Sequence, residues 1–176
     1  IIDQLDKELK DLPHEVIFVN DFSTDNTTKV ILKKINNKNQ ISLCENKKKG
    51  LGGAIVEGIY SSKCDAICIM MADLSDSPQD LVRYWEKLNE GYDCIFGSRF
   101  TSGSRVMDYP RAKLFANRIV NTAIRYAFRI ECNDITNAFK MYRREVIEGC
   151  QPLISPHFNL TVEIPLKAVI RGYSWT

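Results

Sequence analysis

The chain has 176 residues, of which 44% are hydrophobic and 26% charged, the composition of an ordinary globular domain with a packed core. Its formal net charge of +2 is too small to indicate a nucleic-acid-binding protein, and no apolar stretch reaches the roughly 18 residues of a membrane-spanning helix. The six cysteines are scattered along the chain, so we interpret them as reduced thiols of a cytoplasmic protein.

Short apolar strands and amphipathic helices alternate in the first half of the chain. The β-branched run "EVIFVN" is typical of a buried strand, and the helical pattern that follows it directs Val30, Ile31 and Ile35 inward. In chain order we expect a helix over 1–12, a strand over 15–20, a helix over 28–38, a strand over 41–44 and a helix over 54–63.

The second half continues the alternation. Ser77 as N-cap, Pro78 at the first helical position and Gly91 at the C-cap delimit one helix clearly. In chain order we expect a strand over 66–73, this helix over 77–91, a strand over 94–100, a long helix over about 111–129, a strand over 138–144 and a helix over 160–172.

This alternation predicts an α/β fold with a mostly parallel sheet and helices on both faces. Residues 1–176 are expected to form a single domain. Because such sheets normally open on a strand and this chain opens on a helix, we expect an excerpt that lacks the first strand and is incomplete at both ends.

Polar loops follow four of the strands, at the carboxyl edge where open α/β sheets bind ligands. Asp73 ends the apolar run "AICIMM", so this acid must be solvated or paired there. Asp21 offers hydrogen bonds to a nucleoside and Arg99 offers a bidentate contact to phosphate, which together suit a nucleotide sugar. Asp21 and Asp25 also fit a simpler role as helix caps, and "GLGG" lacks the spacing of a phosphate loop.

Arginines form a stripe along the long predicted helix. Arg111, Arg118, Arg125 and Arg129 share one side, and apolar residues occupy most of the rest. This pattern suits anionic lipid headgroups at a membrane surface, although the solvated face of a core helix remains an alternative.

Six segments in this order and spacing resemble glycosyltransferase family 2 domains of the GT-A (nucleotide-diphospho-sugar transferase, Rossmann-like) type, and in particular the polyprenyl-phosphate glycosyltransferases. The likeness covers residues 15–176. The segments are "VIFVNDFSTDNT", "NKKKGLGGAIVEGI", "AICIMMADLSDSP", "DCIFGSRF", "NDITNAFKMYRREVI" and "FNLTVEIPLKAVIRGYSW".

The resemblance implies an inverting transfer from a nucleotide-diphosphate sugar to a polyprenyl (dolichyl or undecaprenyl) phosphate, peripheral to the cytoplasmic face of a membrane. On this resemblance, Val19 and Asp21 contact the nucleoside, and Ala72 and Asp73 lie beside the diphosphate and metal. Arg99 contacts phosphate, and Arg111 and Lys113 together with Arg99 hold the anionic acceptor. Asp134 is the acid near the sugar. Asp73, Arg99 and Asp134 are the catalytic residues on this assignment.

Departures from the family pattern concern the metal. Met71 stands where the first acid of a D-x-D motif belongs, and Asn20 replaces another acid. Mg²⁺ or Mn²⁺ is therefore expected on Asp73 and the donor phosphates, with help from Asp76. Two other functions stay open: transfer to a saccharide acceptor in surface polysaccharide synthesis, for which Asp134 or Glu163 would be the base, and a non-catalytic nucleotide-sugar-binding domain.

Overall fold

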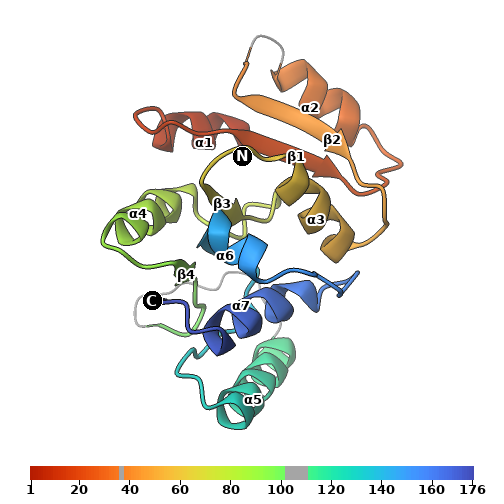
Figure 1. Ribbon diagram of the computed structural model, residues 1–176. Helices are drawn as coiled ribbons and strands as arrows, with labels where there is room; N and C mark the ends of the chain where they lie inside the picture. The colour runs from red at the N-terminus through yellow and green to blue at the C-terminus, as the bar shows by residue number, and fades with distance from the viewer. Residues whose placement is uncertain (36–37, 102–110) are drawn as a thin grey trace.

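The computed structural model describes residues 1–35, 38–101 and 111–176, without the side chains of Arg111 and Lys113 (Figure 1). Its elements, in chain order, are α1 (Ile2–Glu8), β1 (Val16–Asn20), α2 (Thr27–Ile35), β2 (Ile41–Glu45), α3 (Leu51–Ser61), β3 (Ala66–Ile69), α4 (Pro78–Asn89), β4 (Cys94–Phe96), α5 (Arg111–Phe128), β5 (Lys140–Arg143), α6 (Arg144–Gly149) and α7 (Leu160–Ile170). The predicted order is confirmed, and α6 is the one described helix that the sequence pattern did not indicate.

The strands form two sheets. β1 and β2 pair in parallel, from Val16 opposite Ile41 to Asn20 opposite Glu45. The other sheet has the order β3-β5-β4, and β5 is antiparallel to both of its neighbours. The α/β class is therefore confirmed, whereas parallel pairing does not extend to β5.

The antiparallel direction of β5 follows from where the chain enters it. Asp134, shortly before β5, binds Arg99, shortly after the carboxyl end of β4. The chain therefore returns to the sheet at the edge where β4 leaves it, and β5 must run back across the sheet.

Helices cover both faces of the β3-β5-β4 sheet, as predicted. Side chains alternate along each strand, so that Tyr142 packs with α6 and α7 while Met141 packs with α1 and α4. Val146 and Ile164 on the first face and Leu88 on the second are almost fully buried. This sheet is consequently the well-packed part of the molecule.

The β1–β2 half is less buried. Helix α2 has no fully buried residue, and Val30, expected to face inward, is 58% exposed. The prediction for Val30 was wrong because two strands offer too narrow a face for the whole apolar stripe of α2; Ile31 and Ile35 are the half-buried members.

The two sheets approach each other where their strands begin. Glu15, directly before β1, accepts hydrogen bonds from the backbone amides of Lys63 (2.5 Å) and Cys64 (3.1 Å), shortly before β3. Within the described residues, β1 pairs only with β2 and β3 only with β5. The expectation that this chain lacks the first strand of the fold stays a prediction.

Candidate functional site

Asp21 joins the end of β1 to the loop before α3. Its Oδ1 accepts hydrogen bonds from Asn46 Nδ2 (2.8 Å) and from the amide of Gly50 (2.9 Å). The capping role belongs to Asp25 instead, because Asp25 Oδ1 accepts a bond from the amide of Thr27 at the start of α2 (2.9 Å). Asp21 is therefore an exposed carboxylate held at the carboxyl edge, where a ligand can reach it.

Asn20, at the position of an expected acid, has a structural role. It is buried, donates from Nδ2 to Glu45 Oε2 (2.7 Å) and accepts from the amide of Ser23 (3.2 Å). Val19, half-buried in β1, lies against α3 beside Gly58, where an added β-carbon would be 3.3 Å from the Val19 methyl. The end of β1 is thus fixed by its own contacts.

Asp73 lies in an exposed turn beyond β3. Its Oδ1 accepts the amide of Ser75 (2.9 Å), and the bonds from Ser75 lower the pKa of Asp73. Oδ2 accepts no hydrogen bond from the described residues, and the preceding residue, Ala72, is also exposed. Leu74 has a positive φ of 64°, a conformation uncommon for a non-glycine residue. The turn therefore presents one ionised carboxylate to solvent.

Asp76, at the end of this turn, bonds the backbone at its start. Its Oδ2 accepts the amide of Met71 (3.0 Å). Burial raises the pKa of Asp76; the Met71 bond opposes this effect, the charge of Asp73 adds to it, and Arg99 opposes it again. The charges of Asp73 and Arg99 therefore both act on the Asp76 carboxyl.

Arg99 and Asp134 form a bidentate ion pair. Arg99 Nε donates to Asp134 Oδ2 (2.8 Å), Nη2 donates to Oδ1 (2.8 Å), and the amide of Arg99 also donates to Oδ2 (2.9 Å). The side chain of Asp134 is fully buried. Thr136 and Asn121 complete the network, since each donates to Asp134 Oδ1 (3.3 and 3.2 Å).

This network decides how Asp134 can act. A carboxylate with 0% exposure and both oxygens bonded does not touch a substrate from the surface, so its influence passes through Arg99. The predicted catalytic role of Asp134 stays a prediction in that restricted form. The side chain of Arg99 as a whole is 23% exposed.

Lys140 is a buried lysine next to this network, and it was not identified as a site residue from the sequence. Its Nζ donates to the carbonyl oxygens of Ile135 (3.0 Å) and Asn137, and it lies 5.8 Å from the centre of the Phe96 ring. Burial lowers the pKa of Lys140 to about 8. A lysine inside the apolar segment "AFKMY" was the available signal, because a buried lysine is rare unless it is paired.

The structure thus groups the predicted residues into two clusters. Asp73, Arg99 and Asp134 belong to one electrostatic cluster with Asp76 and Lys140. Asp21 and Val19 belong to the β1–β2 side, and the side chains of Arg111 and Lys113 lie outside the described residues.

The protein groups fit a metal that is shared with a ligand. In the described part of the chain, no three His, Cys, Asp or Glu side chains are grouped as a metal cage. Asp73 provides a free oxygen, and Asp76 provides a second carboxylate nearby. Mg²⁺ commonly binds through one or two carboxylates together with substrate phosphates, so this donor set is compatible with such a cation.

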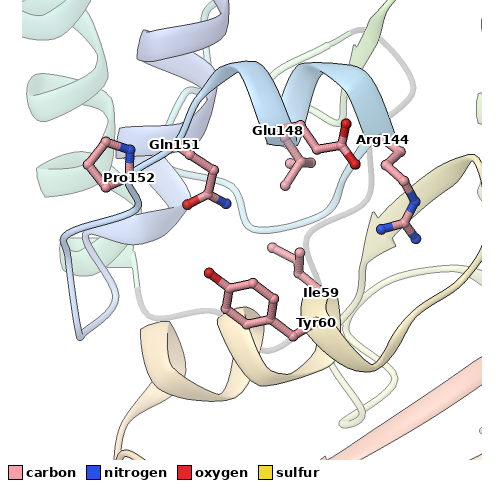
Figure 2. Close-up of a pocket in the computed structure, with 7 residues that line it drawn as sticks. Ile59, Tyr60, Arg144, Glu148, Gln151 and Pro152 are labelled. Carbon is pink, nitrogen blue, oxygen red and sulfur yellow. The ribbon is translucent and has the colours of Figure 1, made fainter.

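A cavity of about 650 Å³ between α3 and α6 lies apart from these residues (Figure 2). Figure 2 shows Tyr60 and Gln151 on opposite sides of it. Arg144, also in its lining, donates to the Cys64 carbonyl (2.8 Å) and to Ser62 Oγ (3.0 Å), near the start of β3. The cavity therefore reaches toward the opposite edge of the sheet from Asp73.

A second cavity, of about 460 Å³, adjoins the candidate site between α5 and α7. It is lined by Asn117, Val120, Ile124, Thr136, Phe158, Asn159, Val162, Glu163 and Leu166. Thr136 connects it to the site, because Thr136 Oγ1 accepts a bond from Arg99 Nη2 (3.1 Å).

Helix α5 exposes large apolar side chains beside basic ones. The exposed residues include Phe115 (68%), Ile119 (55%) and Tyr126 (79%), and its sequence contains no acidic residue. None of the helices in the described ranges is long and apolar enough to span a bilayer.

Comparisons with known proteins agree on a family. The model of the family described as "Glycosyl transferase family 2" matches residues 1–150. A dolichol-phosphate mannosyltransferase of Pyrococcus furiosus is 27% identical over 98% of this chain and 53% of its own length. A polyprenol monophosphomannose synthase of Mycolicibacterium smegmatis is 29% identical over 72% of this chain and 50% of its own length. The chain spans about half the length of these relatives.

Solved structures agree on the fold. Glucosyl-3-phosphoglycerate synthase of Mycobacterium tuberculosis has a TM-score of 0.72 at 15% identity, over 97% of this chain and 61% of that one. Its complex with Mn²⁺, uridine-diphosphate-glucose and phosphoglyceric acid has a TM-score of 0.70 at 14% identity, over 97% and 60% of the two chains. At these identities the likeness establishes the GT-A-like fold alone.

Proposed function

The chain belongs to glycosyl transferase family 2, and we propose that it carries the donor-binding and catalytic part of an inverting enzyme that moves a sugar from a nucleotide-diphosphate sugar to a polyprenyl phosphate. The relatives named as dolichol-phosphate and polyprenol-phosphate enzymes support this substrate class. In the reaction, an oxygen of the lipid phosphate attacks the anomeric carbon. The bond from that carbon to the diphosphate breaks, and its electron pair leaves with the nucleoside diphosphate.

The observation that supports a phosphate acceptor is the state of the two candidate bases. Asp134 is fully buried in its pair with Arg99. Glu163 accepts hydrogen bonds from the amides of Ile154 and Ser155 and from Lys167. A sugar hydroxyl needs a base to take its proton, whereas a phosphate is already ionised near neutral pH. A site in which both carboxylates serve other bonds suits the ionised acceptor.

Asp21 and Val19 face the nucleoside in this proposal, and Asp73 with Ala72 lies beside the diphosphate. Mg²⁺ or Mn²⁺ bound by Asp73, with Asp76 nearby, supplies charge neutralisation of the leaving diphosphate, as does Arg99. The Mn²⁺ complex of the structural neighbour supports the use of a divalent cation. Asp134 holds the Arg99 guanidinium in a fixed orientation, so that little reorganisation is needed as charge develops.

The acceptor would approach from α5. The cavity between α5 and α7 is mostly apolar and reaches Thr136 beside Arg99, which suits the first carbons of a lipid whose phosphate lies at the arginine. Arg111 and Lys113 at the start of α5 are proposed as further phosphate contacts. The exposed apolar side chains and the acid-free sequence of α5 support a peripheral position on an anionic, cytoplasmic membrane surface.

A donor screen tests the proposal. The full-length protein is incubated with membranes, a panel of nucleotide-diphosphate sugars and polyprenyl phosphate, and release of nucleoside diphosphate is measured. The matched control replaces polyprenyl phosphate by the polyprenol without its phosphate. We expect release with one donor and only with the phosphorylated lipid. Release that requires a saccharide instead would establish the alternative acceptor, and no turnover with any donor would contradict an enzyme.

A further inference from the structure

Residues 154–158, in the connection between α6 and α7, lie beyond the part matched by the family model. They pack against the start of α3, and Figure 1 shows this connection passing below that helix. The amide of Gly53 donates to the Pro156 carbonyl (3.2 Å). A β-carbon on Gly52 would lie 2.5 Å from the Pro156 carbonyl carbon and 2.6 Å from the Ser155 carbonyl oxygen. Gly52 is therefore required by a close contact between two backbones.

The same contact reaches the nucleoside side of the site. A β-carbon on Gly50 would lie 3.0 Å from His157 Nδ1, so the His157 ring rests against this glycine. The amide of Gly50 in turn donates to Asp21 Oδ1 (2.9 Å). Gly50 has φ of 117°, a conformation that residues with side chains rarely adopt. Gly50 thus contacts both residues 154–158 and Asp21, so the position of this segment affects the position of the Asp21 carboxylate.

Glu163 on α7 anchors the segment. Its Oε1 accepts the amide of Ile154 (3.0 Å), its Oε2 accepts the amide of Ser155 (2.8 Å), and Lys167 Nζ lies 2.5 Å from Oε1. Burial raises the pKa of Glu163, but the bonds from Lys167, Ser155 and Ile154 outweigh it and bring the pKa down to about 2. The carboxylate is therefore ionised throughout the neutral range.

We infer that Glu163 is a positioning residue of the donor site, which holds residues 154–158 against Gly50–Gly53 and thereby fixes Asp21 for the nucleoside. This inference rests on the proposed function, since it takes Asp21 as the nucleoside contact. Glu163 itself lies on α7, three contacts away from Asp21: its bond to the Ser155 amide, the packing of His157 against Gly50, and the bond from Gly50 to Asp21.

Glu163→Gln tests the anchor. The carboxamide keeps one acceptor oxygen and presents an amino group to the other backbone amide, so one bond is lost and a donor opposes a donor. We expect the donor KM to rise about tenfold while kcat changes by less than about twofold, the pattern of lost binding common to ground state and transition state. Hydrogen exchange of the amides in residues 46–53 should also accelerate. Glu148→Gln, at an exposed position of α6, is the matched control and should change neither.

Gly52→Ala disturbs the same contact from its other side and serves if Glu163→Gln does not fold. Its added methyl meets backbone at 2.5 to 2.7 Å, which displaces residues 155–157. We expect the same selective rise in donor KM. Because both changes release one contact, the double variant should raise KM by clearly less than the product of the single effects.

Unchanged donor KM in both folded variants, or accelerated exchange confined to residues 154–158, would overturn the inference. A fall in kcat with constant KM would also overturn it, since Glu163 would then act on the reaction itself. Absence of turnover in the unaltered protein would instead reject the proposed function. The exchange measurement would still decide whether Glu163 orders residues 46–53.

Discussion

Asp73 and Asp134 are two carboxylates at the same edge of the fold, and they differ in how far the protein itself uses them. Asp73 is exposed, and among the described residues only Ser75 of its own turn bonds it. Asp134 is fully buried and bonded by Arg99, Asn121 and Thr136. The difference shows that a carboxylate's place at a ligand-binding edge does not make it available; its remaining hydrogen-bonding capacity decides whether it binds a ligand or builds the site.

Asp134→Asn should have the largest effect, and the effect should be on stability. It leaves the Arg99 guanidinium without its charged partner in a buried network, which typically costs about 3 to 5 kcal/mol. Chemical denaturation measures the loss in the free energy of unfolding. A change below about 1 kcal/mol would mean that the buried pair does not support the fold.

Asp73→Asn should act in the opposite sense, on activity with the fold retained. We expect a loss of at least about 100-fold in turnover, because the cation that neutralises the leaving diphosphate loses its protein ligand. The free energy of unfolding should change by less than about 0.5 kcal/mol, as for other exposed substitutions. When both assays are run on both variants, Asp134→Asn should mainly lower the free energy of unfolding and Asp73→Asn should mainly lower turnover. Unaltered turnover in Asp73→Asn would remove Asp73 from the mechanism.

Sequence reasoning distinguished these two acids only in part. Asp73 was predictable because it follows an apolar run, although β3 itself ends earlier, at Ile69, and α4 was predictable from Ser77 and Pro78. The pairing of Arg99 with Asp134 joins residues 35 positions apart, and no local pattern specifies such a contact. The antiparallel direction of β5 depends on this same pairing, so it was equally hidden.

Lys140 should give the Asp134 side a pH dependence in the alkaline range, where the carboxylates of the Asp73 turn do not titrate. Burial lowers the pKa of Lys140 from 10.5 to about 8, so between these values the unfolded chain binds more protons than the folded one. The contribution of Lys140 to stability should therefore be complete above about pH 10.5 and fall as pH drops through about 8. Relative to Lys140→Met, the wild type should gain on the order of 3 kcal/mol across this range. A difference in the free energy of unfolding between the two proteins that stays the same at every pH would contradict this.

Met71→Asp should sharpen the comparison by adding a second hard ligand beside Asp73. A carboxylate replaces a thioether that magnesium and manganese do not favour, so Mn²⁺ affinity without donor should rise about tenfold. Met71→Asn is the neutral control and should produce a much smaller gain in calorimetric titration. Equal affinities in all three proteins would place the cation away from this turn.

The account depends most on a cation held between Asp73 and the donor diphosphate. Its most direct test is the anomalous signal of Mn²⁺ in crystals of the full-length protein grown with the nucleoside diphosphate of its donor. We predict one peak at coordination distance from the Asp73 carboxylate and from two phosphate oxygens, with the Arg99 guanidinium facing the same diphosphate. A diphosphate bound elsewhere, or a Mn²⁺ peak without contact to Asp73, would contradict the proposed site.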